Sequence, residues 1–220
     1  MKKLFIFIVC LMITGYANIS FAEGDWDWFL APQGTKREFE IRLPSGNNPV
    51  VGKTTEIVSE IKTDQFGDKT VKIISKSSFG QMSISGYHIY KFDMGTNRVL
   101  EVEMYNQQTG LRQTWDDPYV KVIMSLPLTV GKSWNYKIPP KTDEIREKKV
   151  IGKEKIKLPA GEFEVIIIID EQMGEMNYYA KGIGLVATKV INPVDYEEGW
   201  STNDKIKKYW MNKLTKLSKQ

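Results

Sequence analysis

The only histidine, His88, is the first residue in this sequence to consider for catalysis. It shares the alternating face of its segment with Ile84, Tyr90 and Phe92. A catalytic histidine needs a nucleophile or an orienting acid beside it, and no motif in the sequence supplies either. A single histidine cannot form a histidine metal site. We therefore expect His88 to be a buried, hydrogen-bonded structural residue, and the sequence predicts no cofactor and no metal.

Glu101 and Glu103 are the next candidates, because they alternate with Leu100, Val102 and Met104 and so share one face of a predicted strand. A glycosidase needs two carboxyl groups about 5–9.5 Å apart across a cleft. Many charged strand faces show the same spacing, however. The sequence has no phosphate-binding loop, serine elbow, HExxH motif or EF-hand loop. We therefore predict that the protein is not an enzyme.

Six tryptophans are many for a chain of 220 residues. Trp134 alternates into a strand and is expected in the core. Four others, Trp26, Trp28, Trp115 and Trp200, fall in loop-like and mostly acidic surroundings. They either cap the ends of a sheet or form a surface that binds a sugar or a protein partner. The second alternative makes the protein a scaffold or assembly factor.

The elements that hold these residues follow a period of two, as where Phe39 and Ile41 alternate with Glu38 and Glu40. Short turns rich in glycine, proline and asparagine separate the runs, which favours an antiparallel meander. Long helical crossovers are absent, which excludes a parallel α/β fold. We predict a mainly all-β protein whose sheet curls into a curved sheet or partial barrel, with one or two short helices. The predicted strands lie near 36–43, 53–62, 69–78, 81–93, 98–106, 132–138, 145–158, 162–171, 175–180 and 184–192.

Two segments fit more than one structure. Asp117-Pro118 before residues 119–126 is typical of a helix start, so this segment also fits a short helix. Residues 205–217 fit an amphipathic helix, which could lie on anionic lipid, or a last strand. We favour a strand that covers a remaining sheet edge and protects it with lysines.

The run Phe163–Asp170 is apolar on both faces. Val165 and Ile167 point one way, and Ile166 and Ile168 point the other way. Burying one such side chain contributes about 1.5–3 kcal/mol, so both faces should be covered. The cover is either another layer of the protein or an apolar ligand inside the curved sheet. The second alternative gives a ligand site at Ile166, Ile168, His88, Tyr90 and Phe92.

Residues 1–22 have the features of a secretory signal peptide: two lysines, an apolar stretch from Leu4 to Ile13, and Ser20-Phe21-Ala22 at the cleavage site. Cys10 lies inside the apolar stretch, which argues against a lipidated cysteine. Cleavage leaves residues 23–220 as a single domain without cysteine. It removes two of 31 basic residues and none of the 27 acids, so the net charge becomes 29 − 27 = +2. We expect an exported protein, periplasmic or secreted, without a transmembrane segment or nucleic-acid binding.

Three segments carry a family resemblance: Leu126–Trp134 (LPLTVGKSW), Val150–Phe163 (VIGKEKIKLPAGEF) and Tyr178–Val186 (YYAKGIGLV). This pattern resembles exported bacterial proteins of unknown function of the DUF3108-like and TapB-like kind. The resemblance implies an antiparallel sheet that curls like the LolA/LolB lipoprotein-carrier fold, and it transfers no functional residue. Together with the Ile-rich strand, it favours a non-enzymatic envelope protein that binds a lipid-like ligand or another envelope component.

Overall fold

The computed structural model describes residues 25–43, 50–115, 121–138, 141–190 and 210–219. The predicted signal peptide and Trp200 lie outside these residues. The described elements are η1 (Trp26–Trp28), β1 (Thr35–Leu43), β2 (Val50–Thr63), β3 (Lys69–Phe79), β4 (Met82–Asp93), β5 (Arg98–Asn106), β6 (Arg112–Thr114), β7 (Val122–Ser125), β8 (Ser133–Ile138), β9 (Lys141–Leu158), β10 (Gly161–Asp170), β11 (Glu175–Ala180), β12 (Gly184–Val190) and β13 (Trp210–Lys219).

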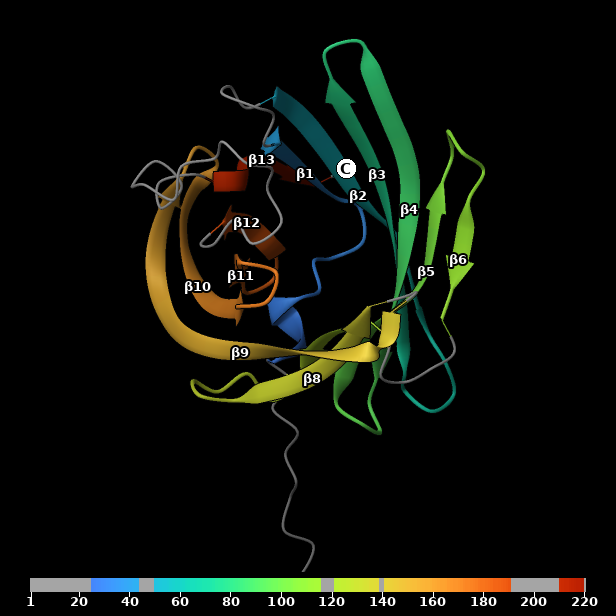
Figure 1. The fold of residues 1–220 in the computed structure, drawn as a ribbon, viewed down its shortest axis with the longest axis vertical. Helices are drawn as coiled ribbons and strands as arrows, with labels where there is room; N and C mark the ends of the chain where they lie inside the picture. Colours follow the sequence, from blue (N-terminus) through green and yellow to red (C-terminus); the bar gives the residue numbers. More distant parts are fainter. Residues whose placement is uncertain (1–24, 44–49, 116–120, 139–140, 191–209, 220) are drawn as a thin grey trace, which may run out of the picture.

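All thirteen strands belong to one antiparallel sheet with the order β6-β5-β4-β3-β2-β1-β13-β12-β11-β10-β9-β8, and β7 pairs with β5 beside β6. The sheet is curved but not closed, which confirms the predicted all-β meander (Figure 1). Its ends nearly meet, because β7 contacts β8 and the backbone N–H of Lys121 donates to the carbonyl of Lys137 (3.1 Å). A second, tighter curl brings β9 against β13.

The structure decides the two segments that fit more than one element. Residues 122–125 form strand β7 and not the alternative helix, because pairing with β5 outweighs the local Asp-Pro signal. The last strand, β13, was correctly preferred over a helix, but it lies between β1 and β12 and not at an edge. Its lysines therefore do not protect an edge. Lys213, for example, forms an ion pair with Glu40 on β1 (3.0 Å).

Strand β10 is buried on both faces, as the sequence predicts. Ile166 and Ile168 are 0% and 1% exposed and belong to the larger core, which joins β2–β5, β7–β11 and η1. Val165 and Ile167 are 1% and 7% exposed and belong to a second core with residues of β1 and β9–β13. The tight curl of the sheet thus supplies the second cover that the Ile-rich strand requires.

The segment that begins with η1 lies inside the curl (Figure 1). The carbonyl of Asp27 accepts a hydrogen bond from the N–H of Gly182, in the turn between β11 and β12 (2.7 Å). Trp26 and Ala31 are 8% and 2% exposed in the larger core. A stretch expected to be a loop therefore fills part of the interior, and we call residues 26–31 the plug segment. In the described part of the chain, there is no helix long and apolar enough to cross a lipid bilayer.

Candidate functional site

Three of the five predicted ligand-binding residues lie in the filled part of the interior. Phe92 is 0% exposed, like Ile166, and Ile168 is 1% exposed. The ring centroid of Phe92 is 5.5 Å from that of Trp26 and 5.7 Å from that of Phe29. The plug segment therefore occupies the space that an apolar ligand would need beside these residues.

Tyr90 and His88 lie at the edge of this filled region. The Tyr90 ring packs edge-on against Phe29, with 4.9 Å between centroids, and burial followed by the charge of Glu101 raises its pKa well above the usual value. The His88 ring stacks on Tyr90, with 6.2 Å between centroids, and its side chain is 32% exposed. His88 Nδ1 lies 2.5 Å from a Glu101 oxygen. His88 is therefore hydrogen-bonded but half-buried.

Beyond His88 the same face of the sheet continues as a strip of apolar side chains. The register of β3 and β4 pairs Phe79 with Met82 and Ser77 with Ile84. These residues lie on the same sheet face as Ile73 and Val71, which are in the larger core. Residues paired across antiparallel strands point to the same face. The strip extends onto β1 through the pairing of β1 with β2. We call these residues the apolar strip: Phe39, Ile41, Phe79, Met82 and Ile84.

The apolar strip is buried at one end and exposed at the other. Phe39 is 3% exposed, whereas Ile84 and Met82 are 46% and 66% exposed. Between them, the hydroxyls of Thr54 and Ser77 are 2.8 Å apart and hydrogen-bond to each other. Their mutual bond lowers the cost of covering these hydroxyls with an apolar group. Through Phe39 and Ile41 the strip is therefore an apolar surface continuous with the second core.

Glu101 and Glu103 face opposite sides of the sheet, which removes the two-carboxylate site considered from the sequence. Tyr90 pairs with Glu101 but Ile89 pairs with Glu103, so one extra residue, Val102, is inserted in β5. Glu101 accordingly reaches His88, on the inner face. On the other face, the Tyr87 hydroxyl donates to Glu103 (2.6 Å), and Arg112 binds Glu103 through two nitrogens (2.8 and 2.9 Å).

Glu101 is a buried carboxylate with two cationic or protonatable partners. It is 5% exposed, and the Lys121 ammonium lies 3.1 Å from its second oxygen. Burial opposes its ionisation, but the hydrogen bond from His88 and the charge of Lys121 outweigh burial and lower its pKa. The Lys121 ammonium also lies 5.4 Å from the Trp115 ring centroid. This arrangement can orient a polar group, but it holds no nucleophile.

The lowered pKa of Glu101 predicts acid sensitivity. A carboxylate whose folded pKa is below its unfolded value, near 4.5, stabilises the fold above that pH and loses this contribution as the pH falls through the folded pKa. We therefore expect wild type to lose more stability than Glu101→Gln between about pH 5 and 3. Urea denaturation at each pH measures this difference. The exposed substitution Glu162→Gln is the control, and equal slopes for wild type and Glu101→Gln would contradict the assignment.

Sequence reasoning missed a buried cation, Arg37. It is 4% exposed, its guanidinium lies 2.7 Å from a Glu56 oxygen, and it donates to the carbonyl of Ile183 (2.9 Å). Arg37 alternates onto the same face of β1 as Phe39 and Ile41. A single charged residue on an otherwise apolar strand face could therefore have indicated a buried cation. The guanidinium joins β1 and β2 to the turn between β11 and β12.

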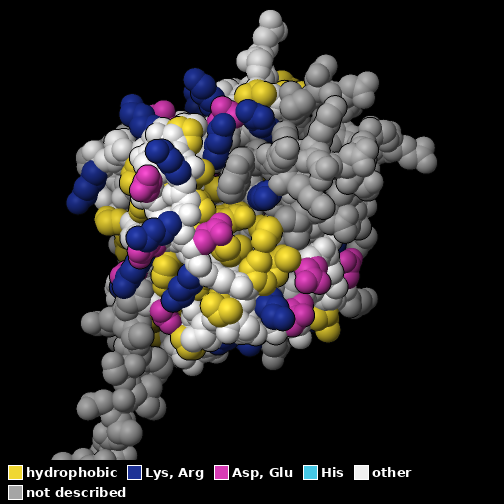
Figure 2. Space-filling model, turned by 90° about the vertical axis from the view of Figure 1, so that its left-hand side faces the viewer, with side chains coloured by type: hydrophobic (Ala, Val, Ile, Leu, Met, Phe, Trp, Pro, Cys, Tyr) yellow, Lys and Arg dark blue, Asp and Glu magenta, His cyan; other side chains and the backbone are white. Residues whose placement is uncertain are grey.

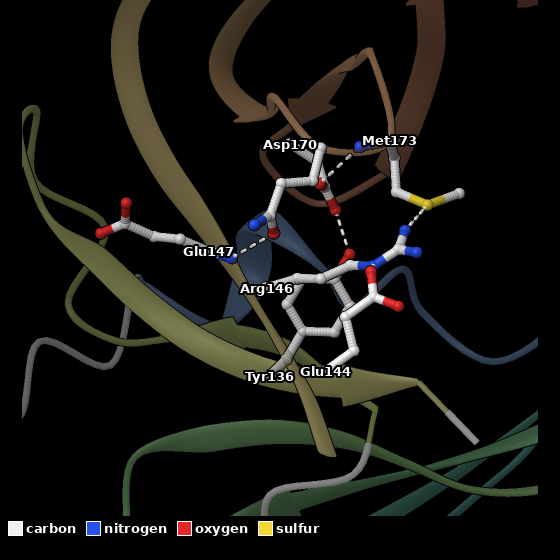
Figure 3. Close-up of polar contacts among 7 residues, drawn as sticks. Tyr136, Glu144, Arg146, Glu147, Asp170 and Met173 are labelled. Atoms are coloured by element: carbon white, nitrogen blue, oxygen red, sulfur yellow. Dashed lines mark hydrogen bonds and ion pairs between the residues drawn. The ribbon is translucent and has the colours of Figure 1, made fainter. Parts of the chain in front are cut away.

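A second polar group lies between β8, β9 and the turn after β10 (Figure 3). The Tyr136 hydroxyl donates to buried Asp170, which also accepts the N–H of Met173 (3.1 Å). Burial, followed by the hydrogen bond to Asp170, raises the pKa of Tyr136. Arg146 contacts the Met173 sulfur and donates to Glu144 (2.8 Å). No sequence motif indicated this group, because its members come from three separate elements.

The described tryptophans proposed for partner binding occupy different settings. Trp26 is in the core and offers no surface. Trp28 is half-buried and lines a pocket of about 360 Å³ with exposed charged residues of β9 and β10, among them Lys153, 5.6 Å above its ring. Trp115 is half-buried under Lys121. The structure therefore does not gather these three side chains into one surface.

Figure 2 shows the side of the molecule that bears β9 and β10. Positive and negative side chains alternate there around a patch of hydrophobic side chains. Two exposed pairs between these strands, Lys155–Glu164 and Lys157–Glu162, have N···O distances of 3.5 and 3.8 Å. On the described part of this face, positive and negative side chains are therefore interspersed. Among the residues that the structure describes, no three His, Cys, Asp or Glu side chains form a group that could hold a metal ion.

Comparisons with known proteins find similar folds and no family. No protein-family model matches the chain, so the resemblance to DUF3108-like proteins is not confirmed, and no curated protein matches it. A protein from Bacteroides fragilis with a YmcC-like fold, inferred to be exported, is 13% identical, with a TM-score of 0.48. A protein from Parabacteroides distasonis, inferred to be a lipoprotein, is 13% identical, with a TM-score of 0.42. Each comparison covers 87% of this chain and 98% of the other.

Proposed function

We propose that the protein is an exported, non-enzymatic envelope protein that holds an apolar, lipid-like ligand against the apolar strip. The observation that carries this proposal is the partial exposure of Ile84 and Met82 on the same sheet face as the buried core. Covering exposed apolar surface that is continuous with a core lowers the free energy by roughly 25 cal/mol per Å². In this proposal the ligand lies next to His88 and Tyr90 and not at Phe92, because the plug segment fills the space at Phe92.

Two features suit the strip to a flexible chain rather than a compact polar molecule. It crosses β4, β3, β2 and β1, and Gly52 on β2 leaves room for the Phe79 ring, since a Cβ at Gly52 would lie 2.5 Å from that ring. Its polar members, Thr54 and Ser77, are bonded to each other. An acyl chain needs such an elongated apolar path and few hydrogen-bonding groups.

Binding of a fluorescent fatty acid to the purified protein tests the proposal. We expect Ile84→Asp to weaken binding about tenfold or more, because it places a charge against the acyl chain. Ile74→Asp is the matched control: Ile74 lies in the partner strand of the same hairpin, is 43% exposed against 46% for Ile84, and points to the opposite face. Thermal unfolding should confirm that both variants fold.

Mass spectrometry of an organic extract, made after secretion with the native leader, gives a second measurement. A co-purified acyl molecule that is lost in Ile84→Asp and retained in Ile74→Asp supports the proposal. Equal binding by the two variants, or no saturable binding by wild type, overturns it.

A second candidate, recognition of a protein partner, rests on the pocket beside Trp28. Its half-buried ring stands among charged side chains that could hydrogen-bond a partner. In a pull-down from envelope extract, Trp28→Ala should then lose a partner that wild type and Phe66→Ala both retain. Phe66 is 80% exposed and is therefore a suitable control.

A further inference from the structure

A small pocket of mixed charge lies between the two nearly meeting ends of the sheet and β11. It has a volume of about 160 Å³. Its polar lining comes from five neighbouring places in the fold: Lys121 before β7, Tyr136 on β8, Lys148 on β9, Asp170 on β10, and Glu175 and Asn177 on β11. Figure 3 shows one wall of this pocket, where Tyr136 and Asp170 meet.

The charges of the lining are ordered along the sheet. Taken from β7 to β11, they run positive at Lys121 and Lys148 and then negative at Asp170 and Glu175. The register supports this order. Asp170 on β10 pairs with Glu175 on β11, and Ile169 pairs with Lys149 on β9, so Lys148 lies on the β9 side of Asp170. One side of the pocket is therefore suited to an anion and the other side to a cation.

Two of these charges are not neutralised by a direct ion pair. Lys121 has Glu101 as a partner at 3.1 Å, whereas in the described part of the chain neither Lys148 nor Glu175 forms an ion pair of its own. The Lys148 ammonium instead lies 4.6 Å from the Tyr136 ring centroid. Burial lowers the pKa of Lys148, and burial and the charge of Asp170 raise the pKa of Glu175. Both groups would therefore gain from a ligand of opposite charge.

The size of the pocket restricts the ligand. An apolar cavity of about 150 Å³ holds a molecule the size of benzene, so about six to nine non-hydrogen atoms fit here. The remaining lining includes Ile123 and Ile138, which suit a short aliphatic group rather than another charge.

We propose that this pocket binds a small free α-amino acid, with its carboxylate toward Lys121 and Lys148 and its ammonium toward Asp170 and Glu175. Such a zwitterion matches the order of the charges, the volume, and the aliphatic part of the lining. A simple anion would meet the two carboxylates, and a simple cation would meet the two ammonium groups. The pocket is separate from the apolar strip, so this proposal does not depend on the lipid ligand.

Isothermal titration of the full purified protein with three probes of equal skeleton tests the proposal. L-Alanine carries both charges, propionate lacks the ammonium, and L-alaninamide lacks the carboxylate. We expect saturable binding of L-alanine and binding weaker by about tenfold or more for the other two, because each leaves one pair of charged groups without a partner. Equal binding of the three probes, or no saturable binding of L-alanine up to about 10 mM, overturns the proposal.

Substitutions then assign the binding to the pocket. Lys148→Met and Glu175→Gln should each weaken L-alanine binding by about tenfold or more. Lys149→Met and Glu171→Gln are the matched controls, because these neighbours are exposed and do not line the pocket. Circular dichroism confirms folding, and Glu175→Gln keeps the test valid if Lys148→Met does not fold. Loss of binding in the controls to the same extent as in the pocket variants also overturns the proposal.

Discussion

Replacing Phe92 by alanine is expected to lower the free energy of unfolding by about 3–5 kcal/mol. The Phe92 side chain is 0% exposed, and its ring contacts Trp26 and Phe29 of the plug segment. The substitution removes a large apolar side chain and leaves a cavity that close-packed neighbours can fill only in part. Urea denaturation of wild type and variant, followed by tryptophan fluorescence, measures the loss.

This result separates a plugged interior from a ligand-filled one. If a ligand occupied the space beside Phe92, the loss would depend on the ligand and would shrink after delipidation. With the plug in place, the loss should be the same before and after extraction with organic solvent. Phe66→Ala is the control, since Phe66 is 80% exposed and its removal should change stability by less than about 0.5 kcal/mol. A Phe92→Ala variant as stable as wild type would contradict the plug.

The strands could be predicted closely because their signal is local. The order of residues along one strand is enough to show the alternation of Phe39 and Ile41 with charged residues. It is also enough to show that the strand with Ile166 and Ile168 is apolar on both faces. Strand order is not local. The position of β13 between β1 and β12 depends on its pairing with β1, whose residues are more than 150 positions away, so the sequence could indicate the strand but not its neighbours.

The candidate sites were harder to predict than the strands. The extra residue at Val102 in β5 turns Glu101 inward and Glu103 outward, and a strict period of two cannot show such an insertion. The plug is another example: Trp26 and Phe29 lie in a segment without period, and their burial follows from where the sheet curls. His88 and Tyr90 were placed on the correct face, but whether that face was filled depended on the plug.

The buried cation Arg37 gives the second large expected effect. Glu56→Ala should lower the free energy of unfolding by about 3 kcal/mol, because it leaves a guanidinium that is 4% exposed without its carboxylate. The Ile183 carbonyl still accepts from Arg37, which keeps the loss near the lower end of the range for breaking a buried pair. Thermal and urea denaturation measure the loss.

A double variant separates the cost of an unpaired charge from the value of the pair. Arg37→Met with Glu56→Leu replaces both charges by apolar groups, so no buried charge is left alone, and the double variant should be more stable than Glu56→Ala. Ion pairs on the surface behave differently: Glu60→Ala breaks the exposed pair with Lys62 and should cost less than about 1 kcal/mol. If Glu56→Ala cost no more than Glu60→Ala, Arg37 would have to reach solvent in the folded protein. The guanidinium would then not join β1 and β2 to the turn that anchors the plug.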